Sequence, residues 1–392
     1  MSGMMRLAAQ WLMRAAESLM PRHLSTWSRA MACELAEIPR DRTALAFAVG
    51  CLWVAITLAL GTWLATQQRR FTTTVTASAR SAQMMNRLID RPRNLGVICA
   101  TVAVGLGLAY MGAGGAPASY LLVNVAALVL GATAWLALGR TASVRLAESG
   151  SAVLALALLL LATALFGAAA DGVSRWVIVG PLSIQVSLIV LPAMIVLYAR
   201  RADTIGTIGM SIAALALAAQ PDRAMAGVLA AGLAAIVVAK RDRLTALALA
   251  VVTVAFVVTL IRPDTSPAVP FVDRILYTAF SVHALAGMAV VTGCSVLILP
   301  ALAGAMRSAN QRSVMMAFGA TWSGVVAAAA LGNYPTPLVG YSGSAVLGYL
   351  LSVALLPRVD RLTAGLNVDG TARAIDSSAE DGIIASHIPK LA

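Results

Sequence analysis

Residues 151–170 read SAVLALALLLLATALFGAAA, a stretch without a single charged side chain. A helix of about 20 apolar residues is long enough to cross the hydrocarbon core of a lipid bilayer. Similar apolar runs occur along the rest of the chain, at residues 95–113, 118–138, 183–199, 203–219, 224–239, 244–261, 278–303, 313–332 and 338–356. The sequence therefore predicts ten membrane-spanning helices between residues 95 and 358.

The composition of the whole chain agrees with a membrane protein. Of its 392 residues, 59% are hydrophobic and only 12% are charged, whereas soluble domains have about 45–50% and about 25%. These values exclude an ordinary cytosolic enzyme and a disordered protein. Nucleic-acid binding is also set aside, because aromatic residues make up only 5% of the chain and no basic patch is interleaved with them. The four scattered cysteines indicate neither a disulfide framework nor a metal site.

The net charge of +12 comes from loops that alternate in character. One set of loops is basic and contains Arg140, Arg145, Arg200, Arg201, Lys240, Arg241, Arg243, Arg307, Arg312, Arg358 and Arg361. The loops between them have few or mixed charges. Since Lys and Arg collect in cytoplasmic loops, the basic set is expected in the cytoplasm and the other set outside.

The N-terminal part of the chain precedes these ten spans. We expect residues 1–43 to contain an amphipathic helix, with Arg6, Gln10 and Arg14 on its polar face and Trp11 on the opposite face. Residues 44–94 are expected to form one extra span and a basic connector, although the run 44–65 also fits a tight helical pair or a partly embedded segment. The mixed-charge tail, residues 359–392, is expected to be a flexible cytoplasmic end.

Three outward-facing segments contain prolines, glycines and polar residues that a simple connecting loop does not require. They are residues 171–185 (DGVSRWVIVGPLSIQ), residues 220–223 (QPDR) and residues 334–344 (YPTPLVGYSGS). Prolines, glycines and hydroxyl groups at membrane depth are typical of broken helices that line a cavity. We therefore expect substrate-binding residues in these segments.

Together the three segments resemble the SEDS family of FtsW- and RodA-like membrane glycosyltransferases. The family pattern G-x-x-R-W…G-P-x-x-I-Q-P-S-E is matched at Gly172, Arg175, Trp176, Gly180, Pro181, Ile184, Gln185 and Ser187. Its Q-P-D turn is matched by Gln220, Pro221 and Asp222, and its final motif by Pro337, Gly340, Tyr341, Ser342, Gly343 and Ser344. The resemblance covers residues 95–358 and implies an all-α, polytopic, ten-span bundle with both ends cytoplasmic, to which this chain adds one N-terminal span.

The resemblance also implies a function. Family members polymerise glycan from lipid II, a saccharide linked to a polyprenyl pyrophosphate, in the bacterial inner membrane during cell-wall synthesis and cell division. A penicillin-binding transpeptidase is the implied protein partner. In this reaction a carboxylate takes the proton of the acceptor hydroxyl, and cations stabilise the departing pyrophosphate.

Site residues follow from the matched positions. Asp273 is the candidate catalytic base, and Arg175, Arg223 and Arg274 are candidate pyrophosphate partners because guanidinium groups suit phosphate geometry. The other substrate-binding candidates are Trp176, Gln185, Gln220, Asp222, Tyr341, Ser342 and Ser344. No cofactor is evident and no metal-ligand cluster is present, so a divalent cation is only an alternative source of positive charge.

The sequence departs from the family pattern at positions that matter for catalysis. Val186 and Leu188 replace a proline and a glutamate, and Arg223 begins a triplet that differs from the family x-G-T. The outer loop, residues 262–274, is short and lacks the family H-T-D-F, with Asp273 out of register by three residues. These departures favour a second hypothesis, a non-catalytic scaffold or lipid-linked-substrate binder. A lipid-carrier flippase is a third alternative.

Each candidate residue also has a purely structural interpretation. Arg175 and Trp176 fit an interfacial anchor, and Asp222 and Arg223 fit an ion pair that caps the next helix. Asp273 fits an N-terminal helix cap. His283 is expected to face a neighbouring helix instead of a metal ion, and Tyr341 to Ser344 fit a site of close helix packing.

Overall fold

The computed structural model describes residues 2–20, 24–70, 91–140, 150–170, 173–180, 182–261, 267–305 and 311–357. The chain divides into two compact units, Met1–Asn86 and Arg87–Ala392. The expected tail 359–392 and most of the expected basic connector lie outside the described residues.

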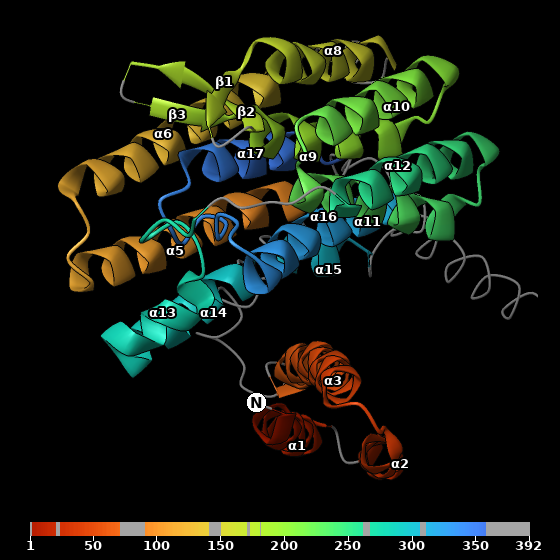
Figure 1. The fold of residues 1–392 in the computed structure, drawn as a ribbon, viewed down its shortest axis with the longest axis vertical. Coiled ribbons are helices and arrows are strands. Elements are labelled where there is room, and N and C mark those ends of the chain that lie inside the picture. The colour runs from red at the N-terminus through yellow and green to blue at the C-terminus, as the bar shows by residue number, and fades with distance from the viewer. Residues whose placement is uncertain are drawn as a thin grey trace, which may run out of the picture. The chain divides into compact units, whose positions relative to one another are not determined.

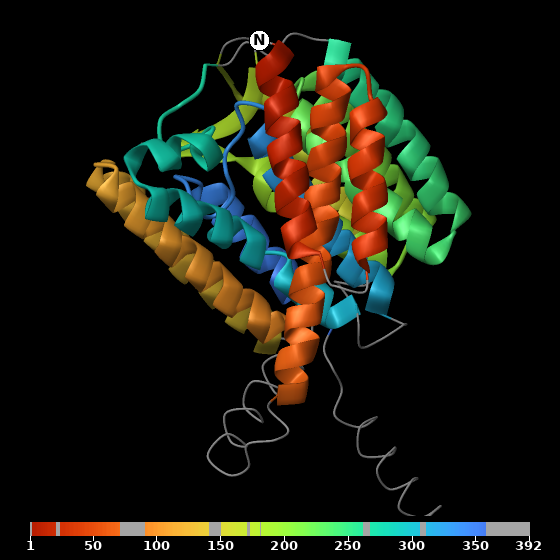
Figure 2. The same cartoon turned by 90° about the horizontal axis from the view of Figure 1, so that it is seen from below.

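The first unit contains three helices that lie side by side (Figure 2). They are α1 (Ser2–Leu19), α2 (Ser25–Glu37) and α3 (Asp41–Arg70). The run 44–65 lies in a single helix and not in a helical pair. Small side chains make the contact between α1 and α3, and its buried residues are Ala9, Met13 and Ala16 of α1 and Ala44, Ala48, Cys51 and Ala55 of α3. Trp11, by contrast, is 75% exposed within this unit.

Arg6 connects α1 to the end of α2. Its guanidinium Nη1 donates to the carbonyl of Ile38 at 2.6 Å, and its Nη2 donates to the carbonyl of Ala36 at 3.0 Å. A cation is favourable at a helix C-terminus because the last carbonyl groups lack partners within the helix. One of the polar side chains of α1 is therefore engaged inside this unit.

The second unit is a bundle of helices that run side by side (Figure 1). Its helices are α5 (Pro92–Ala113), α6 (Ala118–Arg140), α8 (Gly150–Phe166), α9 (Val186–Arg200), α10 (Thr204–Ala219), α11 (Arg223–Lys240), α12 (Arg243–Ile261), α13 (Ile275–Val282), α14 (Ala284–Val296), α15 (Leu299–Ala305), α16 (Arg312–Leu331) and α17 (Gly343–Ala354). Seven helical stretches of the described residues are long and apolar enough to cross a membrane, one of them in α3. Four further apolar helices are shorter, namely α8, α9, α10 and α17. Each of the ten predicted runs overlaps one of these apolar helices. The prediction of a polytopic helical membrane protein is confirmed.

A small antiparallel sheet is the main difference from the predicted all-helical chain. It consists of β1 (Ala168–Ala170), β2 (Val173–Val179) and β3 (Leu182–Gln185), in the order β1-β2-β3. The predicted span 151–170 ends at Phe166, and the span predicted from residue 183 begins at Val186. The β-branched run from Val177 to Val179 favours a strand, and Gly180, with φ of 58°, supplies the left-handed conformation that a tight hairpin turn requires.

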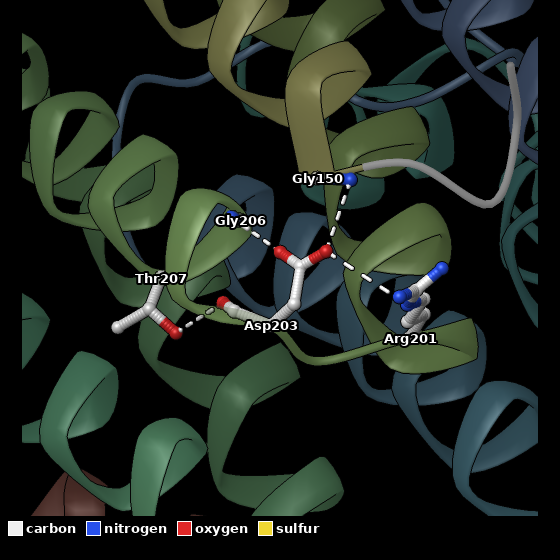
Figure 3. Close-up of polar contacts among 5 residues, drawn as sticks. All are labelled: Gly150, Arg201, Asp203, Gly206 and Thr207. Carbon is white, nitrogen blue, oxygen red and sulfur yellow. Dashed lines mark hydrogen bonds and ion pairs between the residues drawn. The ribbon is translucent and has the colours of Figure 1, made fainter.

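One carboxylate joins two helices at the end of the bundle where the basic loops lie. Asp203 is the N-cap of α10, and its Oδ1 accepts from the Gly206 N–H at 2.7 Å, while its Oδ2 accepts from the Gly150 N–H at the start of α8 at 3.3 Å (Figure 3). Arg201 lies beside the same oxygen, with its Nε at 3.9 Å. Residues 53 positions apart are thereby held together.

Two cations bind helix C-termini at the same end. Lys240 Nζ donates to the carbonyl of Ala199 at 2.6 Å, and Arg200 Nη1 donates to the carbonyl of Leu355 at 2.9 Å. Asp242, in the adjoining loop, accepts from the Thr245 N–H at 2.9 Å, and this hydrogen bond holds the pKa of the carboxyl below its ordinary value. The ends of α9, α11 and α17 and the starts of α8, α10 and α12 therefore belong to one face, consistent with the loop alternation in the sequence.

Replacing Asp203 by alanine is expected to destabilise the bundle. An N-cap carboxylate contributes roughly 0.5–2 kcal/mol, and this one serves two helices, so we expect a loss of about 2 kcal/mol. The measurement is thermal unfolding followed with a thiol-reactive dye in a Cys33→Ser background, because Cys99 and Cys294 are buried until the bundle opens. Arg201→Ala is the control, since exposed ion pairs contribute less than about 1 kcal/mol. Equal melting temperatures for Asp203→Ala and the unmodified protein would contradict this assignment.

Candidate functional site

The hairpin β2–β3 positions the first group of predicted site residues. Arg175 is only 4% exposed, and its Nη2 donates to the carbonyl of Pro221 at 2.6 Å. The half-buried Trp176 pairs with Gln185 across the two strands. Because Arg175 lies within the bundle and bonds to the second motif, the interpretation of this residue as an interfacial anchor does not account for its environment.

The turn 220–222 places a carboxylate in the interior of the bundle. Asp222 is fully buried and is the N-cap of α11, with its Oδ1 accepting from the Met225 N–H at 3.1 Å. Its Oδ2 accepts from Ser187 Oγ at 3.2 Å and from Gln185 Nε2 at 3.4 Å. The expected capping role of Asp222 is thus present, together with contacts that a cap does not need.

Neutral groups supply all the hydrogen bonds described for the Asp222 carboxylate, and it forms no ion pair with another described residue. A buried charge is costly unless it is paired, and within a membrane domain such a group marks a functional site by default. Gln185, Ser187 and Asp222 are named the Asp222 cluster below.

The third motif, residues 334–344, also contacts the Asp222 cluster, although it lies far from the other two motifs in the sequence. Ser344 Oγ accepts from the Gln185 N–H at 3.0 Å. The three segments that the sequence singled out are therefore joined by hydrogen bonds, from Arg175 to Pro221, from Gln185 to Asp222 and from Gln185 to Ser344. These contacts link residues between 37 and 159 positions apart.

Three buried side-chain oxygens in these motifs have no hydrogen-bond partner among the described residues. They are Gln220 Oε1, Thr336 Oγ1 and Ser342 Oγ. The other end of the Gln220 amide donates to the carbonyl of Leu160 at 3.5 Å. Buried polar groups nearly always have a partner, so these atoms indicate where a ligand or a water molecule binds.

Asp273 lies in the outer loop, which is attached to the third motif. Its Oδ2 accepts from the Val269 N–H at 2.8 Å, and its backbone forms a bridge with Pro335. The Tyr341 N–H donates to the carbonyl of Phe271 at 2.7 Å. Asp273 is 8% exposed and is not the N-cap of α13, because that position is Arg274.

Arg274 lines a cavity that does not include the Asp222 cluster. This cavity, of about 350 Å³, is lined by Arg274, Tyr277, Ala330, Leu331, Gly332 and Asn333. Tyr277 OH donates to the carbonyl of Ala330 at 2.8 Å and so joins α13 to the end of α16. None of the residues that contact Asp222 lines this cavity. Arg223, by contrast, follows Asp222 directly and is half-buried.

His283 separates α13 from α14. It is exposed, and its Nδ1 accepts from the Leu285 N–H at 3.1 Å as the N-cap of α14. The sequence predicts that this side chain faces a neighbouring helix, whereas the structure leaves it exposed. Over the part of the chain that the structure describes, no group of three or more His, Cys, Asp or Glu side chains could hold a metal ion.

Sequence reasoning missed Asn124. Asn124 is fully buried in α6, and its amide contacts Gly340 and Ser342 of the third motif. Its signal was present in the sequence, because it is the one strongly polar side chain in the apolar run 118–138 and polar residues in spans are usually functional. Ser187 was matched to the family serine but was not selected as a site residue, and only the fold places it against Asp222.

Comparison with known proteins supports the fold. No protein-family model matches the chain, and no relative among curated proteins was found. Among solved structures, the chain is similar to the rod shape determining protein RodA of Thermus thermophilus, with a TM-score of 0.50 and 19% sequence identity. The similarity covers 67% of this chain and 94% of RodA, and an aspartate-to-alanine mutant of RodA matches equally well. The chain has a SEDS-like fold.

Proposed function

We propose that this protein polymerises glycan from a polyprenyl-pyrophosphate-linked saccharide of the lipid II type, in bacterial cell-wall synthesis. The observation that supports this most strongly is the convergence of the three motifs on Asp222 inside a bundle with the fold of RodA. The membrane is proposed to be the bacterial inner membrane. The protein partner is proposed to be a penicillin-binding transpeptidase.

The proposed reaction joins two lipid-linked saccharides. A hydroxyl oxygen of the acceptor sugar attacks the anomeric carbon of the donor, the bond from that carbon to the pyrophosphate breaks, and the lipid pyrophosphate leaves. Asp273 is proposed to take the proton of the acceptor hydroxyl as general base. Arg175 and Arg223 are proposed to stabilise the charge on the leaving pyrophosphate, because guanidinium groups donate paired hydrogen bonds to phosphate oxygens.

Within this proposal the remaining motif residues bind the substrate. Gln185, Gln220, Asp222, Ser342 and Ser344 supply polar groups near the Asp222 cluster. The half-buried Trp176 and Tyr341 supply aromatic surface. Arg274 lines the separate cavity between α13 and α16 and is proposed to contact the second saccharide chain there.

A second candidate function is a non-catalytic lipid-linked-substrate binder or scaffold. The observation that favours it is the environment of Asp273, whose carboxylate accepts from the backbone of its own short loop. A carboxylate engaged in this way stabilises the loop without any catalytic role.

In-vitro polymerisation separates the two candidates. The purified protein receives labelled lipid II, with and without a penicillin-binding partner, and Asp273→Ala is assayed in parallel. We expect glycan chains with the unmodified protein and at least an about 100-fold lower rate with Asp273→Ala, since general bases contribute about 10²–10⁴-fold. Chains that persist in the variant would remove Asp273 from the mechanism. Binding of lipid II without any chains would favour the scaffold.

A further inference from the structure

One face of α6 holds the backbone that precedes α17. Asn124 Nδ2 donates to the carbonyl of Gly340 at 2.6 Å, and its Oδ1 accepts from the Ser342 N–H at 3.2 Å. A single buried amide thus satisfies two backbone groups on either side of Tyr341. Because both ends of the amide are used, the position of this backbone is fixed relative to α6.

Two further contacts on the same face of α6 support this arrangement. The ring of Tyr120 stacks on Tyr341, with centroids 4.0 Å apart and planes inclined by 14°. A Cβ atom at Gly343 would lie 3.1 Å from Val123 Cγ1, so α6 and this segment approach closely only because position 343 has no side chain. Residues 340–343 are therefore held by several independent contacts to α6.

The hydroxyl of Ser342 has no role in the fold that the structure describes. Ser342 is the N-cap of α17 and is 7% exposed, but its side chain makes no capping hydrogen bond. Its Oγ has no hydrogen-bond partner among the described residues. The hydroxyl of this buried N-cap serine is free to donate a hydrogen bond to a ligand. The positive end of the helix dipole favours an anionic oxygen at this position.

We propose that Asn124 is a positioning residue that holds the hydroxyl of Ser342 for a phosphate oxygen of the lipid-linked substrate. The proposal rests on the proposed function, because it concerns the same site. Ser344, two residues beyond Ser342, bonds to the Gln185 N–H beside Asp222. The same short segment therefore connects the α6 contacts to the Asp222 cluster.

Binding measurements with the full chain in lipid nanodiscs test this inference. The probes are undecaprenyl diphosphate, lipid II and, as a phosphate-free reference, undecaprenol. We expect Ser342→Ala to weaken diphosphate binding about fivefold, as expected for the loss of one hydrogen bond to the ligand. Asn124→Ala is expected to weaken it by no more than this, because Asn124 bonds to the backbone around Ser342 and acts on the ligand only through the Ser342 hydroxyl. Thr133→Val is the matched control on α6, because the Thr133 hydroxyl bonds only to its own helix at Val129.

The double variant separates positioning from general destabilisation. If Asn124 acts through Ser342, Asn124→Ala weakens binding less than about twofold in a Ser342→Ala background. Additive losses would overturn the positioning role. Should Asn124→Ala fail to fold, Tyr120→Leu replaces it, and the same non-additivity with Ser342→Ala is expected.

The proposed function can fail separately from this inference. Diphosphate binding that is unchanged in Ser342→Ala would overturn the hydroxyl contact and leave the proposed function standing. An unmodified protein that binds neither lipid II nor undecaprenyl diphosphate would overturn the proposed function and this inference with it.

Discussion

Asp222→Ala is expected to weaken the binding of lipid II at least about 100-fold relative to the unmodified protein. The carboxylate accepts from Gln185 and Ser187 and orients both side chains. Hydrogen bonds to a charged group contribute about 1.5–3 kcal/mol each, and each 1.4 kcal/mol is a factor of about ten in affinity. The measurement is a titration of the nanodisc-embedded protein with fluorescent lipid II.

Asp203→Ala is the matched control for this experiment. Both residues are N-cap aspartates that accept from a backbone N–H, at Met225 and at Gly206. We expect a comparable loss of thermal stability in the two variants, but normal lipid II affinity in Asp203→Ala. Asp222→Asn adds a second test, because its amide oxygen keeps the cap while the charge is lost. Unchanged affinity in Asp222→Ala would contradict a role of the Asp222 cluster in substrate binding.

Gly107→Ala is expected to destabilise the second unit by about 1–3 kcal/mol, the usual cost of forcing extra atoms into a packed interior. A Cβ atom at this position of α5 would meet the backbone of Val339, 2.6 Å from its Cα. Backbone cannot move aside as the end of a flexible side chain can, so α5 must separate from the segment that contains the third motif. The measurement is thermal unfolding with the thiol-reactive dye.

Gly105→Ala, two residues earlier on α5, is the control. A Cβ atom there has nothing within 4 Å, and alanine favours a helix by about 1 kcal/mol relative to glycine. We therefore expect Gly105→Ala to be as stable as the unmodified protein or slightly more so. A Gly107→Ala variant with an unchanged melting temperature would show that the approach of α5 to Val339 is not required.

Long apolar runs could be assigned from the sequence because each one satisfies the length that a bilayer demands. In two places the predicted spans differ from the observed helices, and each difference has a physical cause. Residues 173–185 are too few and too apolar for periodicity to distinguish a strand from the start of a helix. The run 278–303 is longer than one span needs, and the chain breaks at His283, where extended backbone (φ −167°) ends α13.

Some residues of the candidate site could be predicted from the sequence, and others could not. Arg175, Gln185, Asp222 and Ser344 were predictable because each belongs to a short segment whose prolines, glycines and polar groups are unusual at membrane depth. Asn124 was not selected, since a single polar residue in an apolar run gives no information about its partner. Its contacts with Gly340 and Ser342 span more than 200 residues, and only the packing of α6 against α17 brings them together.

Photocrosslinking of lipid II tests most directly whether the Asp222 cluster is the substrate site. A benzoylphenylalanine at position 176 replaces the half-buried Trp176, which pairs with Gln185. The same amino acid at position 122 replaces Leu122, which is 69% exposed on α6, and reports contact with bulk lipid. We predict a crosslink to lipid II from position 176 that undecaprenyl diphosphate competes away, and no such crosslink from position 122. Equal labelling at the two positions, or no competition at position 176, would contradict this prediction.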